Sequence, residues 1–234
     1  MIFADFLKAV GQMADPRFRR VLLLGVGITI ILLIAVYALF LGLISMFVQE
    51  EVTIPGVGPV TWVGDLLGFG SLLLMLVLSV FLMIPVASAV TSLFLDDVAQ
   101  AVEDQHYPHL PPVDRVSFWD GLKDTVNFLG VLIAANLAAF ILYIFLPFLS
   151  LFIFFGLNGF LLGREYFQLA ASRRIGRTAA LQMRQKNMAQ VWMAGCLMAL
   201  PLSIPLLNLV IPILGAATFT HLFHRINGTA ATSG

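Results

Sequence analysis

Four long stretches of this chain contain no Asp, Glu, Lys or Arg, and they restrict it to a membrane fold. They are Val21–Gln49, Leu66–Leu95, Thr125–Gly163 and Asn187–Thr220. A helix that crosses the hydrocarbon core of a bilayer needs about 20 predominantly apolar residues. Only 11% of the 234 residues are charged, against about a quarter in an ordinary soluble domain. The sequence therefore predicts an all-α, multi-pass membrane protein with a single membrane domain over residues 1–234.

The first two stretches have the length of single transmembrane helices. Val21–Val48 supplies 28 residues and Leu66–Leu95 supplies 30, enough for two long, tilted crossings. Pro85 lies inside the second stretch and is expected to kink it, because proline lacks the N–H that an interior helical position needs.

The third and fourth stretches are too long for one crossing and too short for two crossings with a turn. Thr125–Gly163 has 39 residues and Asn187–Thr220 has 34, whereas two crossings and a turn need more than about 40. Each stretch is predicted to form a hairpin of two short helices that returns to the side it entered. Irregular backbone inside a membrane needs cover from protein or a water-filled cavity, so these hairpins imply neighbouring subunits, a polar cavity, or both. A homo-oligomer is predicted on this ground. The prolines that break them are Pro147, Pro201, Pro205 and Pro212.

The charged segments between the stretches predict the orientation. Basic residues concentrate in residues 1–20 and in Arg164–Lys186, whereas Glu50–Asp65 has three acids and no Lys or Arg. The positive-inside rule places the two basic segments in the cytoplasm and Glu50–Asp65 outside. Asp96–Asp124 also falls inside, although it has seven acids and two basic residues. That weak bias is also compatible with insertion in both orientations.

The segments beside the membrane are predicted to be helical. Met1–Ala14 has apolar residues at helical spacing, which fits either an amphipathic helix in the membrane interface or one packed on the protein's own cytoplasmic segments. Asp96–Glu103 is expected to extend the second long helix until the prolines of Tyr107–Val113 stop it. A new helix is expected near Ser117, and Gln168–Lys186 is rich in helix formers.

The sequence contains no catalytic or cofactor-binding pattern. It has no Gly-rich phosphate loop, no Ser-His-Asp pattern and no pair of carboxylates in an apolar stretch, so neither an enzyme nor a cofactor is predicted. The pairs His106/His109 and His221/His224 have the spacing of two metal ligands on a helix face, but their surroundings favour histidines that bind no metal. Cys196 is the only cysteine, which excludes an intrachain disulfide. Equal numbers of acidic and basic residues predict no nucleic-acid partner.

A cluster of arginines precedes the first long helix, in the sequence Asp15-Pro16-Arg17-Phe18-Arg19-Arg20. Pro16 suits the first position of a helix, and free N–H groups at a helix start together with arginine side chains can hold an oxyanion. Asp15 competes for the same donors. Arginines at a cytoplasmic membrane boundary also anchor lipid phosphates, so the residues alone leave both interpretations open.

Amide side chains inside the apolar stretches are a second sequence feature that bears on function. Asn127, Asn136, Asn158 and Asn208 need polar partners and are expected to face the bundle interior or a water path. Such amides commonly join helices to one another, and they would also suit a path for an ion that is bound weakly.

Three segments of the sequence resemble the CysZ family of bacterial sulfate permeases, part of a wider group with the etoposide-induced-protein type of membrane domain. They are the Pro16–Arg20 segment, Asn158-Gly159-Phe160 through Arg164-Glu165-Tyr166-Phe167, and Ile204-Pro205-Leu206-Leu207-Asn208-Leu209 with Pro212, Gly215 and Thr218. The third segment is the most specific. With the layout of the apolar stretches, the resemblance covers nearly the whole chain.

The resemblance implies sulfate uptake across the bacterial inner membrane for cysteine synthesis. It implies a channel-like homo-oligomer, with a hexamer as a candidate state, in which two long helices accompany two hairpins that penetrate the membrane part way. The family's sulfate-binding residues correspond to Arg19 and Arg20, with Arg17 and Phe18 contributing backbone, and Asn158 and Asn208 are candidate pore-lining residues. A less selective anion channel and a non-transporting membrane scaffold of the same fold are the alternatives.

Overall fold

The computed structural model describes residues 2–47, 52–54, 58–60, 70, 73, 94–113 and 118–229. These residues are helical apart from their connections and one antiparallel pair, β1 (Val52–Ile54) and β2 (Gly58–Val60), which aligns Val52 with Val60. The pair lies in the segment predicted as an external loop. The long helix predicted over Leu66–Leu95, with its kink at Pro85, lies almost entirely outside the described residues.

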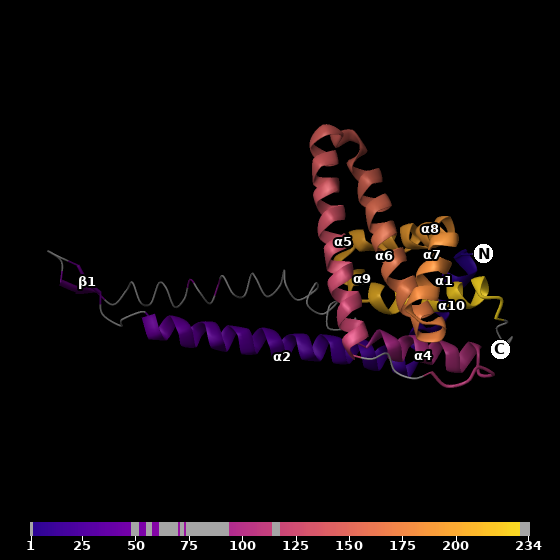
Figure 1. Cartoon of the computed structure of the whole chain (residues 1–234). Helices are drawn as coiled ribbons and strands as arrows, with labels where there is room; N and C mark the ends of the chain where they lie inside the picture. Colours follow the sequence, from indigo (N-terminus) through magenta and orange to yellow (C-terminus); the bar gives the residue numbers. More distant parts are fainter. Residues whose placement is uncertain are drawn as a thin grey trace.

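Helix α2 (Pro16–Phe47) confirms the first long helix and begins at Pro16, where a missing N–H costs nothing. Its apolar part, Pro16–Phe40, is long enough to cross a membrane. Beyond Thr29 most of its described side chains are exposed, and α2 extends away from the other helices (Figure 1). An exposed apolar helix of this length is suited to a lipid environment.

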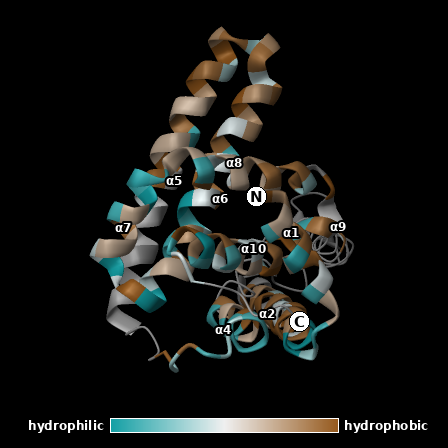
Figure 2. Ribbon diagram, turned by 90° about the vertical axis from the view of Figure 1, so that its right-hand side faces the viewer, coloured by the Kyte–Doolittle hydropathy of each residue, from teal (hydrophilic) through white to brown (hydrophobic). Residues whose placement is uncertain are grey.

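Helices α5 (Phe118–Phe145) and α6 (Ser150–Ile175) form an antiparallel hairpin around a short 3-10 turn at Pro147–Leu149 (Figure 1). The predicted break at Pro147 is therefore confirmed. Exposed apolar side chains gather at the tip, with Phe145 and Phe148 74% and 76% exposed. Figure 2 shows the hydrophobic upper part of the hairpin and hydrophilic residues around α7 (Arg177–Lys186).

Helix α6 continues beyond the predicted end of the hairpin at Gly163 into the basic segment. It stops at Ile175, before Gly176 with its positive φ of 76°, a conformation that glycine adopts without strain. The boundary predicted from the first charged residue differs because Arg164 and Glu165 do not interrupt a helix. The interval Pro147–Ile175 is the other described helix long and apolar enough to cross a membrane.

The fourth apolar stretch also breaks at its prolines, as predicted. Helix α8 (Met188–Ala199) ends in a 3-10 turn over Leu200–Ser203, the short α9 (Pro205–Asn208) follows, and α10 (Ile211–Ile226) carries Pro212 in its first turn. Both α8 and α10 pack against α6.

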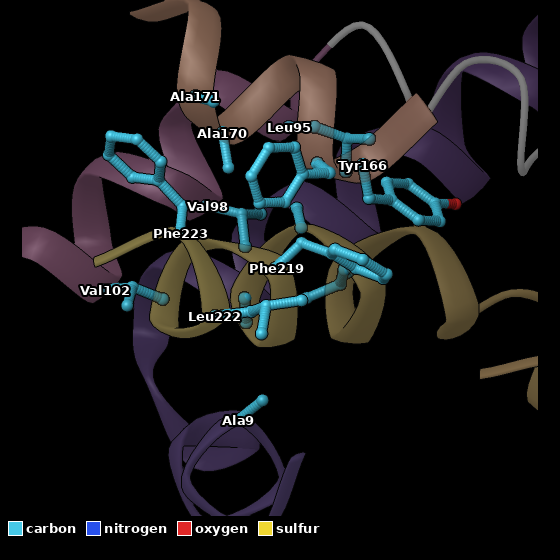
Figure 3. Packing of buried hydrophobic residues seen from close by; sticks show 14 of the residues in the cluster. Ala9, Leu95, Val98, Val102, Tyr166, Ala170, Ala171, Phe219, Leu222 and Phe223 are labelled. Carbon is cyan, nitrogen blue, oxygen red and sulfur yellow. The ribbon is translucent and has the colours of Figure 1, made fainter. Parts of the chain in front are cut away.

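Helix α10 is the centre of a packed group of helices, called the base from here on, which consists of α1 (Ile2–Gly11), α4 (Leu95–His106), α8, α10 and the part of α6 that contacts them. The residues of α10 are buried almost without interruption from Ile211 to His224. This helix contacts α1, α4 and α6. In Figure 3 its aromatic and leucine side chains lie between those of α4 and α6. A helix that is apolar on all sides must be covered on all sides. The labelled core residues are Ala9, Leu95, Val98, Val102, Tyr166, Ala170, Ala171, Phe219, Leu222 and Phe223.

Helix α1 uses one face for this packing, since Asp5 and Ala9 are buried against the base. Helix α1 therefore packs on the protein's own helices. Phe3, Leu7 and Val10 remain exposed on the opposite face, which leaves an apolar stripe available for the membrane interface.

Helix α4 covers the predicted helical segment Asp96–Glu103, but it begins as a new helix at Leu95. Its cap Phe94 has φ −108° and ψ 10°, so the backbone at Phe94 is not helical. It ends at His106, before Pro108, as predicted. The next helix, α5, begins at Phe118, beside the start predicted at Ser117.

Glycines allow α6 and α8 to approach closely. A Cβ added at Gly163 would lie 2.7 Å from the Val191 carbonyl oxygen, and one added at Gly195 would overlap the carbonyl oxygen of Gly159 and lie 2.9 Å from the Gly163 nitrogen. Backbone cannot move aside as a flexible side chain can, so these positions require glycine.

We expect Gly195→Ala to lower the free energy of unfolding by about 1–3 kcal/mol, because overpacked side chains displace the backbone they meet. The matched control is Gly130→Ala on α5, whose added Cβ would meet no described atom within 4 Å. Thermal unfolding in mild detergent should show a lower midpoint for the Gly195 variant alone. Equal midpoints for the two variants would contradict the close α6–α8 contact.

Candidate functional site

Charged residues of α1, α2, α4, α6 and α10 pair with one another. Arg225 Nε lies 2.9 Å from Asp5 Oδ2, which joins the C-terminal part of the chain to α1. Arg17 at the start of α2 pairs with Asp104 on α4. Residues of α6 reach α4 through Arg173 and Arg174. The predicted cytoplasmic segments are thus neighbours in space.

The predicted oxyanion residues lie on the first turn of α2, where they face in different directions. Asp15 Oδ1 accepts the Arg17 N–H at 2.7 Å, so this carboxylate occupies a donor that an anion would need. The Arg17 guanidinium is engaged by Asp104. Phe18 points into the base and is 1% exposed.

Arg19 and Arg20 lie on the opposite, exposed face of α2. Together with Pro16, Leu23 and Leu24 they line a shallow hollow of about 420 Å³. Two guanidinium groups at one helix start offer parallel N–H donors and positive charge to a tetrahedral anion. The two leucines give the same hollow an apolar edge. Of the predicted set, the structure brings Arg19 and Arg20 together and directs Arg17 elsewhere.

The predicted pore-lining amides lie on separate elements. Asn158 is on α6, half-buried, and its Nδ2 donates to the Phe154 carbonyl oxygen at 2.8 Å. Asn208 ends α9 and is also half-buried. The Asn158 bond joins a residue to its own helix, so this amide is satisfied without a helix-to-helix bridge.

Sequence reasoning missed the main electrostatic feature of the base, the carboxylate of Glu103, which is 1% exposed. Arg174 donates to it twice, from Nε to Oε1 at 3.0 Å and from Nη2 to Oε2 at 2.8 Å. His224 Nε2 lies 3.0 Å from Oε1, and Arg173 contributes a longer contact. One carboxylate therefore joins α4, α6 and α10.

His106, His221 and His224 belong to the same cluster. The Tyr107 hydroxyl lies 3.1 Å from His221 Nδ1, and the Tyr107 ring stacks on His224 with centroids 4.1 Å apart. Burial, with the charges of His106, Lys8 and His224, lowers the pKa of His221 to about 3, so its ring is neutral at pH 7. The described residues contain no group of three or more His, Cys, Asp or Glu side chains that could hold a metal ion.

A sequence signal for Glu103 did exist in the periodicity of α4. Leu95, Val98, Ala99 and Val102 define its apolar face, and Glu103, four residues after Ala99, lies on the same face. A carboxylate on an apolar face requires a buried partner. The pattern does not reveal that the partners are Arg174 and His224, which are 71 and 121 residues away.

The protonation of Glu103 is set by opposing effects. Burial raises its pKa, but the hydrogen bonds from His224 and Arg174 and the charges of Arg173 and Arg174 outweigh burial and lower the pKa to about 2. The ionised carboxylate is therefore the form that the folded base stabilises.

These features define a helical membrane protein with a charged, packed base and an arginine hollow at the start of its first long helix. The chain belongs to the family described as sulfate transporter CysZ/etoposide-induced protein 2.4, whose pattern it matches over residues 5–212. No curated protein sequence matches the chain significantly. The family assignment confirms the resemblance, and its transporter character agrees with a protein that is not an enzyme.

We expect acidification to destabilise the protein as Glu103 becomes protonated. The pKa of Glu103 in the folded protein lies below the ordinary value of 4.5. The contribution of the ionised carboxylate to the free energy of unfolding is therefore complete above about pH 4.5 and is lost as the pH falls toward 2. The shift corresponds to a loss on the order of 3 kcal/mol. Unfolding midpoints measured in detergent across this interval should show it.

Glu103→Gln should remove most of that pH dependence and, at pH 7, lower stability by about 3–5 kcal/mol, because the buried arginines lose their counter-charge. The matched control is Asp97→Asn on the exposed face of the same helix, which should behave as the parent protein. An unchanged acid transition in the Glu103 variant would show that another group causes it.

Proposed function

We propose that this protein is a sulfate permease that takes up sulfate across the bacterial inner membrane for cysteine synthesis. The observation that carries the proposal is the hollow with Arg19 and Arg20 at the start of α2, in a chain that belongs to a family with sulfate transporters. Sulfate is a tetrahedral dianion, and paired guanidinium forks suit its oxygens.

In this proposal sulfate is held mainly by the side chains of Arg19 and Arg20, with Arg17 and Phe18 contributing through the backbone of the first turn. The Asp15 carboxylate accepts the Arg17 N–H, which makes the backbone contribution the weaker part. The positive end of the α2 dipole adds to the attraction. Sulfate therefore meets the protein at the boundary between the charged base and the membrane.

The path through the membrane belongs to the same proposal. Charged residues of α1, α2, α4 and α10 pair with one another, which supports a common placement of these segments on the cytoplasmic side. The α5–α6 hairpin leaves the base in a different direction from α2 (Figure 1), which supports a hairpin that enters the membrane obliquely and part way. Asn158 and Asn208 are the proposed polar residues of the path.

The direct test is sulfate flux into proteoliposomes that contain only this protein. Arg19→Ala and Arg20→Ala should each weaken sulfate binding roughly ten- to a hundredfold, as expected for loss of a charge-assisted hydrogen bond. Arg19→Lys and Arg20→Lys should rescue little, because Lys lacks the planar fork. Lys8→Gln, which removes an exposed charge on α1, should leave flux unchanged.

Three outcomes would contradict the proposed site or the proposed function. Normal flux in the Lys variants would show that these arginines only anchor lipid phosphates. Equal competition by sulfite, thiosulfate and chloride would indicate a less selective anion channel. No anion flux from well-folded protein would indicate a membrane scaffold.

We also propose that the protein works as a homo-oligomer, because hairpins that penetrate part way expose irregular backbone that neighbouring subunits can cover. The turn at Pro201–Ile204, with exposed Leu200 and Ile204, is such a segment. Native mass spectrometry in mild detergent should show multiples of 25.6 kDa. A preparation that is monomeric in the membrane, as judged by crosslinking, and still conducts sulfate would contradict the assembly.

A further inference from the structure

A second hollow, of about 300 Å³, lies where α5, α6, α7 and α8 meet. Two arginines from different helices line it, Arg164 on α6 and Arg184 on α7. Helix α7 folds back along α6 after Gly176, and this reversal brings the two residues together although 20 positions separate them. Neither residue belongs to the hollow at the start of α2.

The electrostatics of this hollow favour an anion. Both arginine side chains are half-buried, and Nε of Arg184 is covered without a hydrogen-bond partner among the described residues. Burial and the neighbouring charge of Arg164 lower the pKa of Arg184. A bound anion would accept the free N–H and would offset the repulsion between the two cations.

The rest of the lining is largely apolar and suits a ligand at the membrane boundary. Phe160, Met188 and Trp192 form much of it, and Gln185 adds an amide. Trp192 is fixed because its Nε1 donates to the Gly156 carbonyl oxygen at 2.9 Å, while its side chain stays partly exposed. Indole rings in this position are common at membrane–water interfaces.

We propose that Arg164 and Arg184 form a binding site for a tetrahedral oxyanion, in addition to the hollow at Arg19 and Arg20. The same chemistry occurs in a free sulfate or phosphate ion and in the phosphate of a lipid headgroup. The site does not depend on sulfate transport, since it rests on the contacts of α6, α7 and α8 alone.

Trp192 supplies a reporter for this site. The sequence has three tryptophans, so Trp62→Phe and Trp119→Phe leave Trp192 as the single emitter. The full-length protein in a phosphate-free detergent is titrated with sodium sulfate, with inorganic phosphate and with short-chain phosphatidylglycerol, at constant ionic strength kept with sodium chloride. We expect a saturable change in Trp192 emission with at least one of these probes.

Arg184→Gln should weaken that response roughly ten- to a hundredfold. The matched control is Lys186→Gln, which removes an exposed charge from the same helix and should change nothing. Arg19→Ala should also keep the response, which separates this site from the transport proposal. A response to sulfate or phosphate identifies a soluble ion as the ligand, and a response to phosphatidylglycerol alone identifies a lipid.

The proposal is overturned if no probe changes Trp192 emission in the parent protein, or if Arg184→Gln responds as the parent does. Should Arg184→Gln fail to fold, Arg164→Gln on the other helix gives the same comparison, and the parent titration alone still decides whether any anion binds.

Discussion

The packed base of this protein depends on the buried carboxylate of Glu103. Two hydrogen bonds from Arg174 and a contact with His224 join α4 to α6 and α10, so one charged group links three helices. A carboxylate in this position is unfavourable without its partners. The same helix, α4, also carries Asp104, which pairs with Arg17. The start of α2, with its arginine hollow, is thus fastened to a helix that Glu103 fixes.

Side chains are mostly buried in the base, whereas apolar side chains are mostly exposed on the helices predicted to enter the membrane. In the base α10 is covered on nearly all sides, and glycines let α6 and α8 meet backbone to backbone. Beyond the base, α2 and the α5–α6 hairpin expose apolar side chains to their surroundings. Charged residues gather where the packed base meets the exposed apolar helices, and both arginine hollows lie there.

Features encoded by local sequence were predictable, and features that depend on distant residues were not. Pro16 and Pro147 mark helix starts and breaks because proline acts on its own neighbours, and the arginines next to Pro16 could be noticed for the same reason. The extension of α6 to Ile175 was missed, because the absence of a helix breaker after Gly163 decides it. The partners of Glu103, and the meeting of Arg164 with Arg184, result from tertiary contacts that periodicity cannot reveal.

We propose that a sulfate-like oxyanion binds at Arg19 and Arg20 on a base fixed by Glu103. The most direct measurement is an experimental structure with selenate, which replaces sulfate and is located by its anomalous scattering. We expect a selenium peak within hydrogen-bonding reach of both guanidinium groups at the start of α2. Saturating selenate with no peak at Arg19 and Arg20, in a structure whose base matches this one, would contradict it.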